Sequence, residues 1–298
     1  MKKRYWILII VAALFVIAIL SNSGDKDPSN GGEDPNGENG IDKSNPEIKV
    51  HTGWKTPVSI INTNEWEDAC SISPDGNTLY YTKGEGLDVD SYSATLSNGI
   101  FGIPIPHSFN QEGLPDGAVH TQDDEVLYFA SIRAEGLGSA DIYIYENGNF
   151  ENFEIINSEY LESEPFISAD GNTFYFGSNR PGSSGDADIW FSTKVDGEWQ
   201  EPQNLGEPVN SNKLDTQPFV TSDGNELYFT STNRNGIGGP AIFRSIKVDG
   251  VWQEPEVVIS GFVGEPTLTE DKSKLYFVHI FRDGSKLLDA DVYMTERE

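Results

Sequence analysis

An internal repeat constrains the fold of this chain more than any other feature of its sequence. Residues 168–202 read SADGNTFYFGSNRPGSSGDADIWFSTKVDGEWQEP, and residues 221–255 read TSDGNELYFTSTNRNGIGGPAIFRSIKVDGVWQEP. An aromatic tripeptide marks five such units, at spacings of 48, 47, 53 and 48 residues. The tripeptides are Leu79-Tyr80-Tyr81, Leu127-Tyr128-Phe129, Phe174-Tyr175-Phe176, Leu227-Tyr228-Phe229 and Leu275-Tyr276-Phe277. A period of this length indicates a repeat architecture.

Each unit carries the turn and strand signals of a four-stranded blade. An Asp stands four residues before every tripeptide, and Gly follows it in three units, which is typical of a tight hairpin turn. A third strand follows, with patterns such as ADIY and ADIW, and then a fourth with the pattern Gly-x-aromatic-x-x-Pro. No segment of the repeat region shows helical periodicity. The sequence therefore predicts an all-β, five-bladed β-propeller.

The ends of the repeat region predict how the ring closes. The fifth unit stops after its third strand, whereas the segment around Trp54 carries the glycine, aromatic and proline pattern with no unit before it. We expect this segment to complete the last blade, which removes the free sheet edges. The predicted blades cover about 66–113, 114–160, 161–213, 214–262, and 263–298 together with 50–58.

These motifs resemble a known repeat family. Ser-x-Asp-Gly-x-x-Leu-Tyr-Phe, Ser-Asn-Arg-Pro-Gly, Ala-Asp-Ile-Trp and Gly-x-Trp-x-x-Pro are similar to the WD-like propeller repeat of the TolB type, most strongly over residues 161–260. The resemblance implies an extracytoplasmic propeller that acts mainly as a binding platform, often in envelope proteins. Proteins with this repeat vary in blade number, and some carry a catalytic domain beside the ring; we expect none here.

The amino terminus predicts export. Lys2, Lys3 and Arg4 precede an apolar run at residues 5–20, so residues 1–22 are expected to be a signal anchor or a cleaved signal peptide. The basic residues should stay cytoplasmic, with the rest at the cell membrane's outer side, or secreted if cleavage occurs. Residues 23–49 are rich in Gly, Asn, Asp, Pro and Ser and are expected to form a flexible linker, followed by the propeller at 50–298.

The acidic composition narrows the classes of partner. Forty-eight acidic and 20 basic residues give a formal net charge of -28, which argues against nucleic acid and favours cationic partners. The alternative interpretation is that the charge only keeps the surface solvated or reflects a salty habitat. The partners that we expect are a protein, a peptide or a glycan at the envelope, with residues 5–20 contacting the membrane.

A ring of acids and amides is expected at the mouth of the axial channel, where the innermost strand of each blade begins. The candidate ligand-binding residues there are Asp68, Asp116, Glu164, Gln217 and Glu265. Their register is uneven, since the two aspartates stand seven residues before the turn Asp and the other three stand six before it. Paired carboxylates in a five-bladed ring could also act as the acid and base of a glycoside hydrolase.

A second ring of arginines is expected on the same face. Arg133, Arg180, Arg234 and Arg282 follow the turn Asp by 10 or 11 residues. They are either donors to a ligand's carboxylate or hydroxyl groups or structural residues that pair with the third-strand aspartates, Asp141, Asp188 or Asp291. Arg234 is present although Ala241 replaces the Asp in its unit, which weakens the case for obligatory pairing.

The sequence predicts no cofactor. The acid pairs Asp88/Asp90, Asp186/Asp188 and Asp289/Asp291 have the oxygen chemistry for Ca²⁺ but too few ligands for a complete site. The four histidines show no zinc-ligand spacing, and Cys70 is expected to pack on an inner strand. We therefore expect a non-enzymatic binding propeller, with a glycoside hydrolase and a purely structural envelope protein as alternatives.

Overall fold

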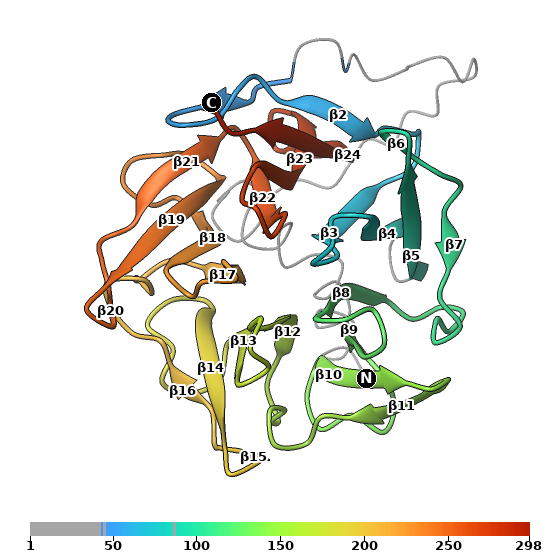
Figure 1. The fold of residues 1–298 in the computed structure, drawn as a ribbon, viewed down its shortest axis with the longest axis vertical. Helices are drawn as coiled ribbons and strands as arrows, with labels where there is room; N and C mark the ends of the chain where they lie inside the picture. Colours follow the sequence, from blue (N-terminus) through green and yellow to red (C-terminus); the bar gives the residue numbers. More distant parts are fainter. Residues whose placement is uncertain (1–42, 44–45, 86–87) are drawn as a thin grey trace.

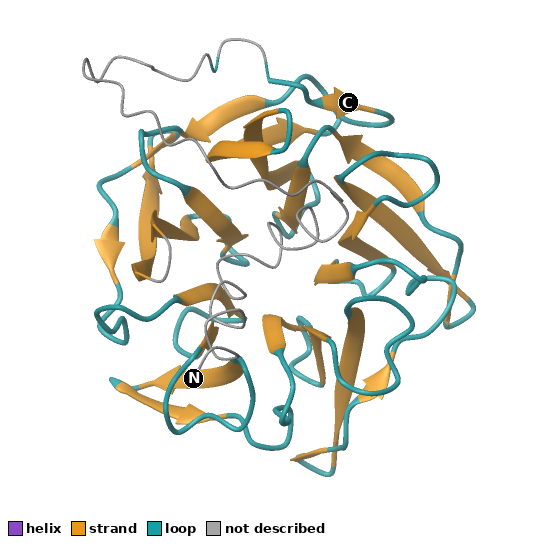
Figure 2. Cartoon of the chain, turned by 180° about the vertical axis from the view of Figure 1, so that it is seen from behind, coloured by secondary structure: helices purple, strands orange, loops and turns teal. Residues whose placement is uncertain are grey.

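A computed structural model of the chain describes residue 43 and residues 46–85 and 88–298. These residues form strands and loops and no helix, as Figure 2 shows. Five antiparallel sheets surround a central axis (Figure 1). The predicted all-β, five-bladed propeller is confirmed.

The blades share one strand order from the axis outward. The innermost strands are β3 (Glu67–Ile72), β8 (Asp116–Thr121), β12 (Glu162–Ile167), β17 (Asp215–Val220) and β22 (Val263–Leu268). The second strands are β4 (Thr78–Glu85), β9 (Leu127–Ser131), β13 (Thr173–Ser178), β18 (Glu226–Thr232) and β23 (Lys274–Asp283). The third strands are β5 (Asp88–Ser97), β10 (Asp141–Glu146), β14 (Asp188–Val195), β19 (Pro240–Val248) and β24 (Lys286–Glu296).

The outer edge of each blade differs in detail from the prediction. The aromatic residues of the Gly-x-aromatic pattern lie on short strands that extend the third strand as a hairpin: β6 (Ile100–Phe101), β15 (Glu198–Trp199) and β20 (Val251–Trp252). The edge strands follow the proline instead: β7 (Ile105–Pro106), β16 (Gln203–Asn204) and β21 (Glu256–Ser260). In the second blade a single strand, β11 (Asn149–Asn152), takes the place of both the hairpin strand and the edge strand. Proline has no N–H to donate, so an edge strand naturally begins after it.

The predicted ring closure is confirmed. β2 (Val58–Ile61) pairs antiparallel with β24, and the blue and red ends of the chain meet there in Figure 1. Trp54 forms a bridge to Arg297 that repeats the pairing of Lys194 with Trp199 inside the third blade. The paired strand extends to residue 61, beyond the predicted range of 50–58, because the edge strand again follows the proline, here Pro57.

The start of the described chain differs from the predicted linker. β1 (Lys49–Val50) adds a further strand to the fourth blade through pairing with β21, so Lys49 is part of a sheet rather than of a flexible spacer. The predicted membrane segment at residues 5–20 and most of the linker lie outside the described residues. In the part of the chain that the structure describes, we find no helix with the length and apolar character needed to cross a membrane.

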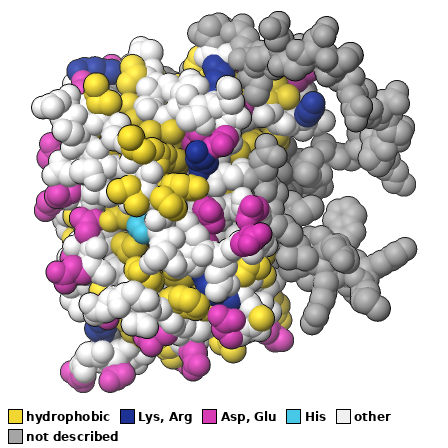
Figure 3. Space-filling view, turned by 90° about the vertical axis from the view of Figure 1, so that its right-hand side faces the viewer, with side chains coloured by type: hydrophobic (Ala, Val, Ile, Leu, Met, Phe, Trp, Pro, Cys, Tyr) yellow, Lys and Arg dark blue, Asp and Glu magenta, His cyan; other side chains and the backbone are white. Residues whose placement is uncertain are grey.

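The core lies between the blades. The last residue of each aromatic tripeptide is almost fully buried because blades cover both faces of the second strand. These residues are Tyr81, Phe129, Phe176, Phe229 and Phe277. The edge of the ring that carries β5 to β7, seen in Figure 3, exposes acidic side chains and three isoleucines, Ile100, Ile103 and Ile105.

Candidate functional site

A β-bulge near the axis sets the positions of the candidate side chains. Every innermost strand shifts its register against the second strand at the same place. One residue of each bulge has a left-handed backbone, with φ between 51° and 59°: Ala69, Ala118, Glu164, Gln217 and Glu265. Such a conformation is costly for residues other than glycine and often occurs at functional sites. All five residues line one axial cavity.

The bulge also explains the uneven register of the predicted acid ring. Counted from the bulge, Asp68 is one residue before the left-handed position and Asp116 is two before it. Asp116 is therefore equivalent to Glu67, Glu162 and Asp215, not to the residues that face the axis. The structure divides the predicted ring into an axial acid cluster and a separate set of buried ion pairs.

The axial acid cluster consists of Asp68, Glu164, Gln217 and Glu265. Gln217 Nε2 donates to Glu265 Oε1 at 2.9 Å, and the backbone N–H of Glu265 donates to Gln217 Oε1 at 3.1 Å. The carboxyls of Asp68 and Glu265 lie beside each other, and Trp66 Nε1 donates to Asp68 Oδ2 at 3.2 Å. Asp68 Oδ1 and Glu265 Oε2 are buried and have no hydrogen-bond partner among the described residues.

Burial and mutual repulsion raise the pKa values of this cluster. Burial and the charge of Asp68 raise the pKa of Glu164 to about 8. Burial, together with the charges of Asp68 and Glu164, raises the pKa of Glu265 well above its ordinary value, and burial also raises the pKa of Asp68. Carboxyls that share a site cannot all ionise at neutral pH, so the cluster holds protons that a bound cation would displace.

The space beside the cluster is small. The cavity has a volume of about 40 Å³, and its lining includes Pro165, Pro218 and Pro266. Cys70 takes the equivalent position in the first blade, where it is buried and its thiol donates to the carbonyl of Glu265 at 3.4 Å. This volume suits a water molecule or an ammonium group, whereas pockets for small organic ligands usually measure roughly 300–1,000 Å³.

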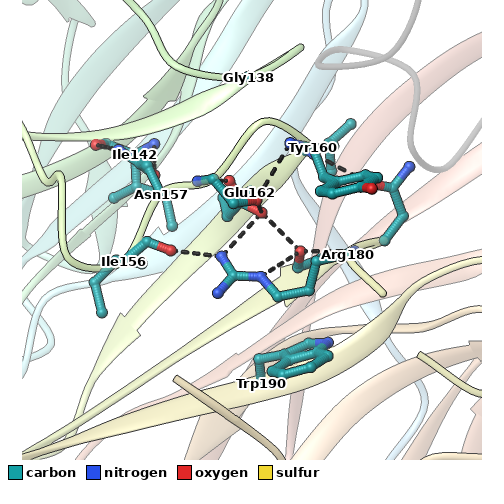
Figure 4. Close-up of polar contacts among 12 residues, drawn as sticks. Gly138, Ile142, Ile156, Asn157, Tyr160, Glu162, Arg180 and Trp190 are labelled. Carbon is teal, nitrogen blue, oxygen red and sulfur yellow. Dashed lines mark hydrogen bonds and ion pairs between the residues drawn. The ribbon is translucent and has the colours of Figure 1, made fainter. Parts of the chain in front are cut away.

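Three of the predicted arginines form buried pairs with inner-strand acids. Arg133 contacts Asp116 at 2.6 Å, Arg180 contacts Glu162 at 2.9 Å, and Arg234 contacts Asp215 at 3.3 Å. In Figure 4 the Arg180 guanidinium lies between Glu162 and the carbonyl of Ile156, close to Trp190. The prediction that these arginines and Asp116 line the channel mouth is corrected: they join the start of one blade to the loop before it.

The alternative prediction, that the arginines pair with third-strand aspartates, is also wrong. Asp141 accepts hydrogen bonds from the backbone of Leu137 and Gly138, and Asp188 accepts them from Ser184 and Gly185. Loop N–H groups therefore satisfy these carboxylates. Arg234 needs no third-strand Asp, which explains why it is present beside Ala241.

The fifth blade departs from this scheme. Val263 stands where the other blades have an acid, so Arg282 lacks the inner-strand partner and contacts the exposed Glu47 at 3.3 Å, above the ring of Phe262. Arg282 therefore belongs neither to the axial cluster nor to the buried pairs. Sequence spacing could not distinguish Arg282 from Arg133, Arg180 and Arg234, because all four follow the turn Asp of their unit by 10 or 11 residues.

The acid pairs considered for Ca²⁺ differ from one another. Asp188 is occupied by loop N–H groups, and Asp88 accepts a hydrogen bond from the backbone of Gly113. Asp289 and Asp291 instead both contact Lys43. Among the described residues, no group of three or more His, Cys, Asp or Glu side chains could hold a metal ion.

His120 lines the candidate site, although its spacing in the sequence did not predict this. It borders both the axial cavity and a second cavity of about 270 Å³ beside the Asp-Gly turns. Its ring packs on Phe166 with centroids 4.4 Å apart, and Nδ1 lies 3.3 Å from Ser71 Oγ. Burial lowers the pKa of His120 to about 4, so its ring is neutral at physiological pH. No spacing in the sequence indicated this position, because the bulge on the inner strand interrupts the alternation of faces just before His120.

Replacement of Glu164 by glutamine is expected to reduce the loss of stability between pH 5 and pH 8. Folded Glu164 keeps its proton up to a pKa of about 8, whereas the unfolded chain releases it near 4.5, so the wild-type free energy of unfolding falls as pH rises through this window. Between pH 5 and pH 8 the free energy of unfolding of the wild type should fall by on the order of 2–4 kcal/mol more than that of the variant. Urea unfolding at several pH values measures it, with the exposed Glu198 replaced by glutamine as control; parallel curves for both variants would contradict the assignment.

Known structures share this fold. No protein-family model matches the chain, and no curated protein is significantly similar to it. TolB from Acinetobacter baumannii is similar in structure, with a TM-score of 0.52 and 15% identity over 82% of this chain; this chain spans only 57% of that protein.

Glycoside hydrolases are similar to the same degree. The catalytic domain of an α-L-arabinofuranosidase from Coprinopsis cinerea has a TM-score of 0.56 and 8% identity, covering 82% of this chain and 96% of that one. An α-L-arabinofuranosidase from Lactobacillus brevis has a TM-score of 0.51 and 14% identity, covering 80% and 94%. At these identities the likeness shows a propeller fold that the chain shares with TolB proteins and with glycoside hydrolases, while membership of the TolB-type family stays a prediction.

Proposed function

We propose that this chain is a non-enzymatic binding protein of the cell envelope, whose axial acid cluster accepts a cationic group from a protein or peptide. The observation that carries the proposal is the pair of unpartnered carboxylate oxygens, Asp68 Oδ1 and Glu265 Oε2, beside a cavity the size of an ammonium group. A lysine side chain or an amino terminus supplies the missing donors. The net charge of -28 attracts such a partner over a longer range.

The proposed location rests on the amino-terminal sequence. Lys2, Lys3 and Arg4 followed by the apolar run at residues 5–20 support a membrane-anchored propeller on the outer side, where the axial mouth can meet partners. We place no cofactor in the binding step. The acid cluster alone supplies the charge that recognises the cation.

Glycoside hydrolysis is the second candidate, since three carboxyls converge on the axis of a ring that arabinofuranosidases share. Two observations favour binding over hydrolysis. The carboxyls of Asp68 and Glu265 contact each other, whereas hydrolases separate their two carboxyls by roughly 5–9.5 Å. The cavity of about 40 Å³ also leaves no room for a sugar ring between them.

Affinity for a single lysine is expected to increase with pH. Ionisation of Glu164, whose pKa lies at about 8, adds negative charge to the cluster, so the Kd for a short peptide with one lysine should fall at least fivefold between pH 6 and pH 9. The same peptide with an acetylated lysine should not bind, because acetylation removes the charge. Isothermal titration calorimetry at 150 mM NaCl measures both.

Matched variants separate the axial cluster from the acidic surface. Glu164→Gln should weaken binding of the lysine peptide at least fivefold at pH 9, while Glu198→Gln, which removes one exposed charge, should leave it unchanged. Equal effects of both variants would mean nonspecific attraction and would reject the site. Turnover of an arabinan or xylan panel that Glu164→Gln or Glu265→Gln abolishes would replace the proposal with a hydrolase.

A further inference from the structure

Lys43 lies in a pocket of oxygen atoms at the junction of the first and fifth blades. Its Nζ is 2.6 Å from Asp291 Oδ1, 2.8 Å from Asp289 Oδ2 and 2.7 Å from the carbonyl of Thr63. Asn62 Oδ1 is a fourth contact at 3.2 Å. Two carboxylates, an amide oxygen and a backbone carbonyl therefore surround one ammonium group, whose side chain is only 14% exposed.

The other blades explain why this pocket needs a cation. Asp141 and Asp188, the equivalents of Asp291, receive N–H donors from the loop before the third strand. In the fifth blade β23 and β24 form a long hairpin instead, and its residues pair with each other up to Asp283 and Lys286. No loop N–H among the described residues donates to the Asp291 carboxylate, so Lys43 takes that role.

The two carboxylates of the pocket, Asp289 and Asp291, carry more negative charge than the single ammonium group of Lys43 neutralises. Asp291 is fully buried, and its Oδ2 has no hydrogen-bond partner among the described residues. Burial raises the pKa of Asp291 to about 6, against the favourable effect of Lys43. Glu67 adds a third acid nearby: it occupies the position at which the next three blades have an acid paired with arginine, yet it has no such partner among the described residues, and burial raises its pKa to about 7.

We propose that the oxygens of Asn62, Thr63, Asp289 and Asp291 form a cation site that Lys43 occupies and that binds Ca²⁺ when the ammonium group is absent. Carboxylate, amide and backbone carbonyl oxygens are the ligands that Ca²⁺ prefers, and its flexible coordination accepts water at the remaining positions. Asn62 and Thr63 are exposed, which gives a hydrated ion an entry path. The unpartnered Asp291 Oδ2 offers a further ligand atom.

The site couples the cation to the chain before the propeller. Lys43 precedes β1 and is the first described residue, so its side chain attaches this segment to the fifth blade. A divalent ion that binds the same oxygens competes with the lysine. Binding of Ca²⁺ to these oxygens therefore excludes the contact between Lys43 and the fifth blade.

Calorimetric titration of the full-length chain with CaCl2 tests the inference. Lys43→Gln should bind one Ca²⁺ with a Kd of about 10⁻⁴–10⁻³ M, as extracellular calcium modules do, and at least tenfold more tightly than the wild type. Ca²⁺ should also raise the melting temperature of Lys43→Gln more than that of the wild type. Mg²⁺ should bind more weakly, because it demands a regular octahedral site.

Two controls locate the binding. Lys55→Gln removes a lysine from an exposed ion pair with Glu296 on the same blade and should gain no Ca²⁺ affinity. Asp291→Asn in the Lys43→Gln background should abolish binding; if that protein does not fold by circular dichroism, Asp289→Asn replaces it. Equal Ca²⁺ affinity of the Lys43 and Lys55 variants, or unchanged binding after loss of either aspartate, would overturn the proposal.

Discussion

Replacement of Arg133 by methionine is expected to lower the free energy of unfolding by about 3–5 kcal/mol. Both side chains of the Arg133–Asp116 pair are fully buried, and the guanidinium also donates to the carbonyl of Phe109 at 2.8 Å. Methionine fills much of the volume between the rings of Phe129 and Phe150 but leaves the Asp116 carboxylate without its cation. The loss therefore comes from an uncompensated buried charge rather than from packing.

Urea denaturation of three variants separates these contributions. Lys55→Met removes a lysine whose ion pair is about half-exposed and should cost less than about 1 kcal/mol. The double variant Arg133→Met with Asp116→Asn should recover more than half of the loss, since no charge is then buried alone. A cost below about 1 kcal/mol for Arg133→Met would mean that the pair does not hold the start of the second blade to the loop before it.

Replacement of Trp54 by alanine is expected to cost about 3–5 kcal/mol. Its ring is buried against the fourth and fifth blades, beside Tyr228 and Phe277, and Arg297 stacks over it at 4.9 Å. The substitution should also weaken the backbone pairing of β2 with β24, because the segment around Trp54 comes from the other end of the chain and no hairpin turn holds it to the last blade. Hydrogen exchange of the β24 amides should accelerate in this variant.

Trp199 gives a matched control within one blade. It pairs with Lys194, which lies 4.7 Å from its ring, as Arg297 does with Trp54. A hairpin turn keeps Trp199 beside its partner, and its ring is partly exposed, so Trp199→Ala should cost less and leave exchange in β14 almost unchanged. Equal losses for the two variants would show that ring closure adds nothing to stability.

The candidate site was predictable only in part. Glu164, Gln217 and Glu265 could be found because they share a position relative to the turn Asp, and the structure brings them together with Asp68. Asp116 was misplaced because a bulge changes the register by one residue, and in a strand one residue decides which face a side chain takes. The acid that each arginine contacts was equally hidden, since the inner-strand acid and the arginine loop of one blade are brought together only by the pairing of the two strands between them.

The sequence by itself determined the number of blades, their strand order and the closure of the ring. These properties follow from local signals, a tight turn before each aromatic strand and a glycine before each outer aromatic, that act within a few residues. The tertiary structure decided which acids face the axis, which are paired with arginine, and that Lys43 occupies an acid pocket in the fifth blade. Those features depend on small shifts of register and on contacts between segments as far apart as Lys43 and Asp291, where burial sets the charge of each group.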